Sequence, residues 1–398
     1  MRLSIIGTCG PIAIVVALLA GLAAGGAAAQ KTATGPAGWN RDGAATYLDQ
    51  RMNAWSARGK KLRTGQGQAT CVSCHTALPY ALARPSLRRA MHVRTPTPEE
   101  VRLLEDVVRR VDTYETHQPY YDSDDRKTVE SRGTEAVLNA LILASAAAER
   151  GQHDPAEPTR RAFHRLWETQ RSDGAWDWLD FGLEPLESAD AAYYGATLAA
   201  MAVGTVPASA LGQSAEAAAG TKRLRAYLTE RYASQNVFNR VSALLASTRW
   251  KDLLTRTQRE TLVAEVRRAQ QDDGGWSLHA MGGWRWSTTG WRAWRTSPPG
   301  TLDAALLAKS DGYATGLVVY TLRSAGLPVD DSAVAGGLRW LRAHQQDVQA
   351  GDRTYQAWRS YSLNRNREHG GDGGESWRRL FMSDAATAYA VLALVASE

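Results

Sequence analysis

The residues best suited to chemistry lie within one short turn, Cys71 to His75, which reads CVSCH. The chain has three cysteines, and Cys71 and Cys74 are two of them. Thiols at this spacing serve in redox exchange, zinc binding, disulfides or covalent haem attachment. The surroundings lack the βαβ pattern of a redox pair and a second pair of zinc ligands, and a disulfide here would restrain little chain. Covalent haem is the favoured prediction, because the adjacent imidazole could bind the iron.

The turn resembles the attachment site of c-type cytochromes. Residues 42–58, before the turn, have helical spacing like the first helix of small cytochromes. The resemblance implies one covalent haem c per chain, anchored at Cys71 and Cys74, with His75 as axial ligand of the iron. It covers only the N-terminal part of the chain.

The sixth ligand of the iron is expected among the residues that follow. Met91 and His92 lie 16 and 17 residues after His75, and His117 comes next. A protein ligand would suit an electron carrier, whereas an open position would let a small molecule reach the iron. Both alternatives stay open.

The first 29 residues have the features of a secretory signal peptide. Arg2 is positively charged, residues 5–24 are almost continuously apolar, and Ala27 to Ala29 offer a small-residue cleavage site. The alternative is a retained anchor, because the apolar stretch is about long enough to span a bilayer. No later stretch approaches that length, so we expect an exported, periplasmic protein with no membrane span after cleavage.

The charge of the chain gives no support for nucleic acid as a partner. The formal net charge is +6, or +5 once Arg2 leaves with the signal peptide (6 − 1). Basic residues are interspersed with acidic ones rather than gathered into a stripe.

From Thr97 onward the sequence predicts one helix after another. Thr97 and Glu100 have the spacing of a capping box, with Pro98 at the first helical position. Periodic apolar residues predict further helices near 132–150, 158–170, 188–203, 219–233, 236–247, 256–271, 302–325, 331–345 and 383–396. Alternating strand-like runs are scarce, so the predicted class is all-α.

A short motif, Q-x-x-D-G-x-W, follows two of these helices. It occurs at Gln170 to Trp176 and at Gln270 to Trp276. A third, degenerate copy is suggested at 340–347, with an inserted loop before 358–364. Gly and Asp suit a tight turn at a helix end, and Trp supplies a large packing surface.

Several helices begin with an acid and are then almost wholly apolar, as after Asp190, Asp311 and Asp384. Such helices should be buried. Buried helices alternating with charged ones predict a closed ring of helical hairpins that forms its core by stacking.

The Q-x-x-D-G-x-W copies resemble the QW repeats of the squalene–hopene and oxidosqualene cyclase superfamily, which shares its ring with prenyltransferases. The resemblance implies an α/α toroid. We therefore expect three parts: a signal peptide at 1–29, a haem-c attachment segment at 30–96 and a squalene-cyclase-like toroid at 97–398.

Catalytic acids are only weakly indicated. Cyclases of this superfamily protonate an alkene with a D-x-D-D motif, and the string DSDD ends at Asp124 and Asp125. In the family the motif leads straight into an apolar helix, whereas RKTVESR follows it here and is typical of a solvated stretch. The single acids Asp190, Asp311 and Asp384 could line a cavity, although stabilising helix N-termini is the simpler role.

The sequence thus favours a haem oxidoreductase or electron-transfer protein. Its expected partners are a small apolar or isoprenoid-like ligand in the ring and a periplasmic redox protein. The alternatives are a terpenoid cyclase with an Asp acid, or a non-catalytic haem-binding scaffold. The Trp- and Arg-rich stretch 282–300 is interpreted as a packed surface loop, a lid over a pocket or the seat of the haem segment.

Overall fold

A computed structural model describes residues 38–398 except 60, 65–66, 117–124, 153, 155, 208–210, 212–213, 283–304, 306–307, 364–377 and 379. The described residues belong to one compact unit, Ala37–Glu398. It includes both residues 38–96 and the helices after Thr97. The predicted signal peptide lies outside the described residues. Within that described part, no helix is long and apolar enough to cross a membrane.

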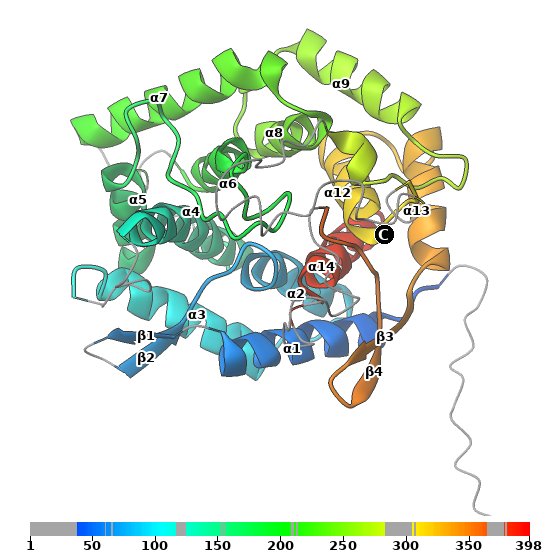
Figure 1. The fold of residues 1–398 in the computed structure, drawn as a ribbon, viewed down its shortest axis with the longest axis horizontal. Coiled ribbons are helices and arrows are strands. Elements are labelled where there is room, and N and C mark those ends of the chain that lie inside the picture. Colours follow the sequence, from blue (N-terminus) through cyan, green and yellow to red (C-terminus); the bar gives the residue numbers. More distant parts are fainter. Residues whose placement is uncertain are drawn as a thin grey trace, which may run out of the picture. The chain divides into compact units, whose positions relative to one another are not determined.

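Helices dominate this unit, and they alternate along the chain between an outer and an inner position (Figure 1). The outer helices are α1 (Arg41–Arg58), α3 (Pro98–Asp112), α5 (Glu157–Glu168), α7 (Ala215–Arg231), α9 (Arg256–Arg268) and α13 (Ser332–Ala343). The inner helices are α2 (Ala77–Ala90), α4 (Asp125–Glu149), α6 (Ala192–Thr205), α8 (Val237–Arg249), α12 (Gly312–Ser324) and α14 (Phe381–Val395). Each inner helix packs against the next, and α14 packs against α2, which closes the ring. The arrangement is mostly helical and resembles an α/α toroid.

The inner helices are buried on nearly all sides, as their composition predicts. In α6, every residue from Tyr193 to Val203 is buried. Small residues let neighbouring inner helices approach closely: a Cβ on Gly316 of α12 would lie 2.6 Å from the backbone nitrogen of Ala390 in α14. The core is therefore continuous around the ring.

The two ends of the inner ring differ in their connections. We call the end where the inner helices begin the entry end, and the end where they finish the exit end. The chain enters the inner helices through 59–76, 113–124, 169–191, 232–236, 269–311 and 344–380. It leaves them through 91–97, 150–156, 206–214, 250–255 and 325–331. In sequence, five of the six entry connections are longer than any exit connection.

Helix α4 begins earlier than predicted. It starts at Asp125, and the stretch RKTVESR forms its first turns instead of a solvated segment. Lys127 and Glu130 are buried there, and the Lys127 Nζ donates to Glu130 Oε2 at 2.5 Å and to the carbonyl of Asp180 at 2.6 Å. An ion pair within the helix and a hydrogen bond to a distant connection therefore bury charges that the sequence places in solvent.

Two β-hairpins correct the strictly all-α prediction. Strands β1 (Lys61–Thr64) and β2 (Gly67–Thr70) pair antiparallel between α1 and α2. Strands β3 (Gln346–Ala350) and β4 (Arg353–Ala357) pair antiparallel between α13 and α14. The second hairpin is the inserted loop predicted within the third repeat.

The repeated motif forms the same brace at each copy. In the first, the Gln170 amide donates to the carbonyls of Gly174 and of Gly220 in α7, at 3.0 and 3.1 Å. The Trp176 indole donates to the carbonyl of Leu166 in α5 at 2.9 Å. Each brace thus fastens one outer helix to the next.

The second and third copies repeat these bonds. Gln270 donates to Ala333 of α13 at 2.9 Å, and Trp276 bonds back to α9. In the third, Gln345 donates to the carbonyl of Asn40, just before α1, at 2.9 Å, and Trp358 bonds back to α13. The hairpin merely separates the Gln from the Trp, so the third copy is split rather than lost.

Candidate functional site

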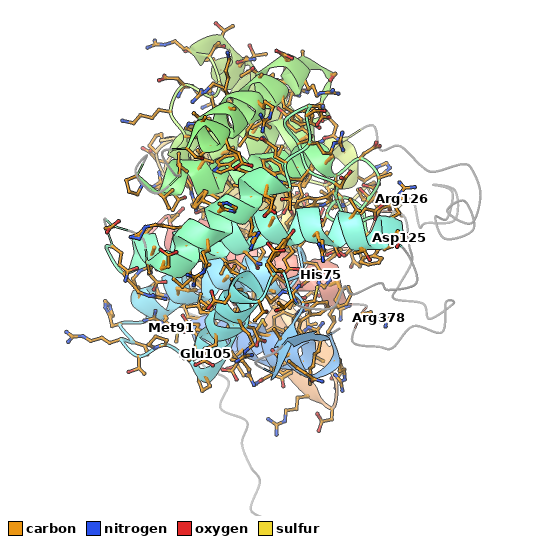
Figure 2. The ribbon with its side chains drawn as sticks, turned by 90° about the vertical axis from the view of Figure 1, so that its left-hand side faces the viewer. His75, Met91, Glu105, Asp125, Arg126 and Arg378 are labelled. Atoms are coloured by element: carbon orange, nitrogen blue, oxygen red, sulfur yellow. The ribbon has the colours of Figure 1, made fainter. Side chains whose placement is uncertain are left out.

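The structure brings most of the candidate residues predicted from the sequence to the entry end. They are Cys71, Cys74, His75, Asp125, Asp190, Asp311 and Asp384. Figure 2 shows Asp125, Arg126 and Arg378 toward one side of the molecule and Met91 toward the other, with His75 between them. Asp124, His117 and most of the stretch 282–300 lie outside the described residues.

Met91 and His92 are not near the predicted iron ligand. His75 precedes α2, whereas Met91 and His92 follow it. The helix has 14 residues, so about 21 Å of helix separates the two positions. His92 is exposed, in a left-handed conformation with φ 58°. The structure therefore does not bring either candidate sixth ligand to His75.

Asp311 has the simple role that the sequence allows. It is the N-cap of α12, and its Oδ1 accepts from the backbone nitrogens of Tyr313 and Ala314 at 2.9 and 3.0 Å. Its Oδ2 accepts from the nitrogen of Leu278 at 2.6 Å, which fixes the preceding connection. Asp125 and Asp190 are exposed. None of these three carboxyls has an environment that suggests catalysis.

Asp384 lies at the centre of a buried network in the first turn of α14. Arg51 of α1 donates from Nε to Oδ1 at 2.6 Å and from Nη2 to Oδ2 at 3.1 Å. Tyr47 donates to Oδ1 at 2.9 Å, and Thr76 donates to Oδ2 at 2.6 Å. Burial raises the pKa of Asp384, while Arg51 and the two hydroxyls oppose that rise. The network ties α1 and the start of α2 to α14.

His75 adjoins this network. Its Nδ1 lies 2.7 Å from the Thr76 hydroxyl, and its Nε2 lies 3.9 Å from Glu187 Oε1. The ring is stacked on Phe381, with centroids 3.7 Å apart, and meets the edge of Trp55. Its side chain is only 2% exposed. The imidazole is therefore oriented by contacts on several sides.

The two cysteines differ in their surroundings. Cys74 is fully buried, whereas Cys71 is half-buried, and no disulfide joins the two. Burial raises the pKa of the Cys74 thiol, and the nearby Glu187 raises it further. Because side chains pack closely around His75 and Cys74, haem at this turn would require Phe381 and Glu187 to move. Attachment of haem c at Cys71 and Cys74 stays a prediction.

Two glutamates that were not predicted as site residues, Glu184 and Glu187, lie in the connection before α6. Glu184 and Glu187 belong to one tight turn, in which the backbone nitrogens of Leu183 and Glu187 each donate to the other residue's carbonyl, at 3.0 and 2.9 Å. Both side chains are buried. Burial raises the pKa of Glu184 to about 7; the Ser188 hydroxyl opposes this, and the charges of Asp190 and Asp180 add to it.

Glu187 has a different environment on the same turn. Its Oε1 accepts from the backbone nitrogen of Cys74 at 3.2 Å and lies near His75. A signal for this site exists in the sequence LEPLES: two acids alternate with leucine and proline in a connection. Acids at helix N-termini are explained by the helix dipole. These two acids lie among apolar residues in a connection, where that explanation does not apply.

Aromatic side chains from the inner helices converge inside the ring. The rings form a series of neighbours. Tyr194 of α6 contacts Phe238 of α8, Phe238 contacts Tyr313 of α12, and Tyr313 contacts Tyr389 of α14. The three tyrosines are buried, and burial raises their pKa values. Trp178, in the same connection as Glu184, meets the edge of Tyr194. The acidic turn therefore adjoins an aromatic interior.

Comparison with known proteins gives distant structural similarities. No family model and no curated protein matches the chain. A solved structure titled as a point variant of UGL with dGlcA-Glc-Rha-Glc is 12% identical, with a TM-score of 0.48, over 89% of this chain and 95% of that one. An unsaturated glucuronyl hydrolase from Streptococcus agalactiae is 10% identical, with a TM-score of 0.47, over 89% of this chain and 92% of that one.

These findings correct the family predicted from the sequence. The structures found are glucuronyl hydrolases rather than squalene cyclases with a haem segment. The functions drawn from that resemblance are likewise wrong: the haem oxidoreductase or electron carrier, the terpenoid cyclase and the haem-binding scaffold. Export, the small apolar ligand and the periplasmic redox partner stay predictions.

Proposed function

We propose that the entry end holds the active site of an acid–base enzyme that cleaves glycosidic bonds, with Glu184 as proton donor and Glu187 as the second carboxyl. The observation that carries this proposal is the pair itself: two buried carboxyls on one turn, in unlike environments. Pairs of this kind allow one group to stay protonated while the other is ionised. Glycoside hydrolysis ordinarily uses such a pair.

Glu184 suits the donor role. Its Oε2 accepts from the Ser188 hydroxyl at 2.8 Å, and the negative charges of Asp190 and Asp180 add to the effect of burial in raising its pKa. With a pKa of about 7, the side chain holds its proton in a large share of molecules at neutral pH. Glu187, by contrast, accepts the backbone N–H of Cys74 and lies beside the imidazole of His75.

The reaction then balances with water as the second reactant. The Glu184 carboxyl gives its proton to the glycosidic oxygen as the bond from that oxygen to the anomeric carbon breaks. Water adds its oxygen to the anomeric carbon, and Glu187 takes the proton that the water loses. Glu184 afterwards regains a proton and Glu187 releases one, so no oxidant or reductant is needed.

Leaving groups of different acidity provide the test. We expect the wild-type protein to cleave saccharide glycosides and their p-nitrophenyl analogues. Glu184→Gln should lower kcat on saccharides by about a hundredfold or more, the usual range for a lost general acid. It should affect the p-nitrophenyl analogues much less, since nitrophenolate leaves without a proton.

Glu260→Gln, at an exposed position of α9, is the control and should match wild type on both substrates. Glu187→Gln should slow both classes alike. Absence of cleavage by the wild-type protein across neutral and uronic saccharides of both linkage types, or equal rates for Glu184→Gln and wild type, would refute the proposal.

A further inference from the structure

The geometry points to Thr76 and Asp384 as positioning residues that hold the imidazole of His75 in its Nδ1–H tautomer, with Nε2 directed at Glu187. The role of this arrangement in catalysis rests on the proposed function, whereas the tautomer itself can be measured without it. The Thr76 hydroxyl links the Asp384 carboxyl to the His75 imidazole.

Asp384 is an acceptor on both of its oxygens. Oδ1 accepts hydrogen bonds from the Tyr47 hydroxyl and from Arg51 Nε. Oδ2 accepts hydrogen bonds from Arg51 Nη2 and from the Thr76 hydroxyl. A guanidinium has only donors, and it is always charged. Arg51 directs an N–H at each oxygen of Asp384, and a proton bound to either oxygen would clash with that hydrogen. The carboxyl is therefore ionised and accepts hydrogen bonds at both oxygens.

The Thr76 hydroxyl has a single hydrogen, and Asp384 takes it. Thr76 Oγ1 lies 2.6 Å from Asp384 Oδ2 and 2.7 Å from His75 Nδ1. Toward the imidazole the same oxygen can therefore only accept. The hydrogen of that second bond must come from Nδ1. In a neutral imidazole Nε2 then carries no hydrogen.

Packing fixes the direction in which Nε2 points. Phe381 stacks on the ring, Trp55 meets it edge-on, and Glu187 Oε1 lies 3.9 Å from Nε2. The separation of 3.9 Å is longer than a hydrogen bond, so Glu187, once it has taken the proton from water, would donate to the acceptor Nε2 after a small shift of its side chain. Thr76 and Asp384 would thereby favour the proton-transfer step without touching substrate.

Thr76→Val removes the hydroxyl at nearly constant volume, and Thr76→Ser retains it. In nitrogen-15 spectra of the full chain labelled at histidine, His75 is identified by the signal missing from His75→Asn. Wild type and Thr76→Ser should both show the Nδ1–H tautomer. Thr76→Val should lose that preference, and its kcat on a saccharide should fall by about tenfold to a hundredfold, the usual cost of losing an orienting partner.

Thr321→Val is the matched control, because it removes another buried hydroxyl of an inner helix, near the exit end. It should leave the His75 signal and kcat unchanged. An Nε2–H tautomer in wild type, or an unchanged His75 signal in Thr76→Val, overturns the inference. The expected spectra from a protein that cleaves no glycoside would instead confirm the positioning and refute only the proposed function.

Discussion

The two ends of the inner ring differ in the charged side chains that meet the helix termini, and the direction of the helices explains why. At the entry end, Asp311 and Asp384 lie in the first turns of α12 and α14 or just before them. At the exit end, arginines donate to backbone carbonyls just beyond the helix ends. Arg323 donates to the carbonyls of Leu327 and Ala396, and Arg88 donates to those of Val93 and Arg94. Because the inner helices run parallel, their dipoles favour acids at one end and bases at the other.

This comparison separates structural acids from candidate catalytic ones. Asp311 and Asp384 have a structural explanation in helix capping and ion pairing. Glu184 caps none of the described helices, and burial and neighbouring acids disfavour its charge. Burial also raises the pKa values of Asp311 and Asp384, so the distinction lies in their contacts: a buried acid outside the helix termini is a better candidate for function than one that stabilises a helix.

The largest effect should come from unpairing a charge at the entry end. Arg51→Met leaves the Asp384 carboxylate buried without its guanidinium, which should lower the free energy of unfolding by about 3–5 kcal/mol. Arg323→Met at the exit end leaves only partly exposed carbonyls and should cost about 1 kcal/mol. Denaturant unfolding of both variants gives the comparison, and similar losses would contradict the distinction between the two ends.

A smaller effect concerns Glu184 and pH. Its pKa is about 7 in the folded protein and 4.5 ordinarily, so the folded state binds the proton more tightly. Stability should therefore fall as pH rises from about 4.5 through 7, by about 3 kcal/mol in total from this group. In Glu184→Gln that part of the decline should vanish. Urea unfolding between pH 4.5 and 8.5 measures it, and parallel curves for the variant and wild type would exclude the buried neutral acid.

The smallest expected change in stability comes from substituting two glycines that have a left-handed backbone conformation. Gly174, in the entry connection before α6, has φ 96°, and an added Cβ would lie 2.3 Å from the carbonyl oxygen of Arg223. Gly326, after α12 at the exit end, has φ 93° and open space around it. Gly326→Ala should cost about 1–2 kcal/mol from backbone strain alone.

Gly174→Ala should cost more than Gly326→Ala, since the steric overlap with Arg223 adds to the same strain. Thermal unfolding of the two variants isolates this excess. If Gly326→Ala is the more destabilising substitution, the first brace is not the close contact that the structure describes.

Local signals made much of the ring predictable. The capping box at Thr97 and Glu100 forms with both hydrogen bonds, at 3.2 and 2.8 Å. Apolar periodicity located the buried helices, and the motifs at Gln170 and Gln270 located the braces. These features depend on residues a few positions apart, which a sequence displays directly.

The remainder depends on contacts between distant segments. The first turns of α4 are charged, and Lys127 is buried there because its Nζ donates to the carbonyl of Asp180 and lies over the ring of Phe181, both in the connection before α6. Likewise, the environment of Glu187 requires Cys74 and His75, more than a hundred positions earlier. Residues 77–90, which the sequence reading assigned to a separate haem segment, form an inner helix because α14 packs against them.

Closure of the ring by α2 and α14 also sets an order of events during synthesis. Helix α2 is translated early, but its partner α14 lies at Phe381–Val395, near the last residue of the chain. Until those residues leave the ribosome, the face of α2 that α14 covers has no native partner among the described helices. Contacts so distant in sequence form slowly, and apolar surface that waits for them is prone to aggregation. The nascent chain therefore remains an open arc of hairpins until α14 has been synthesised.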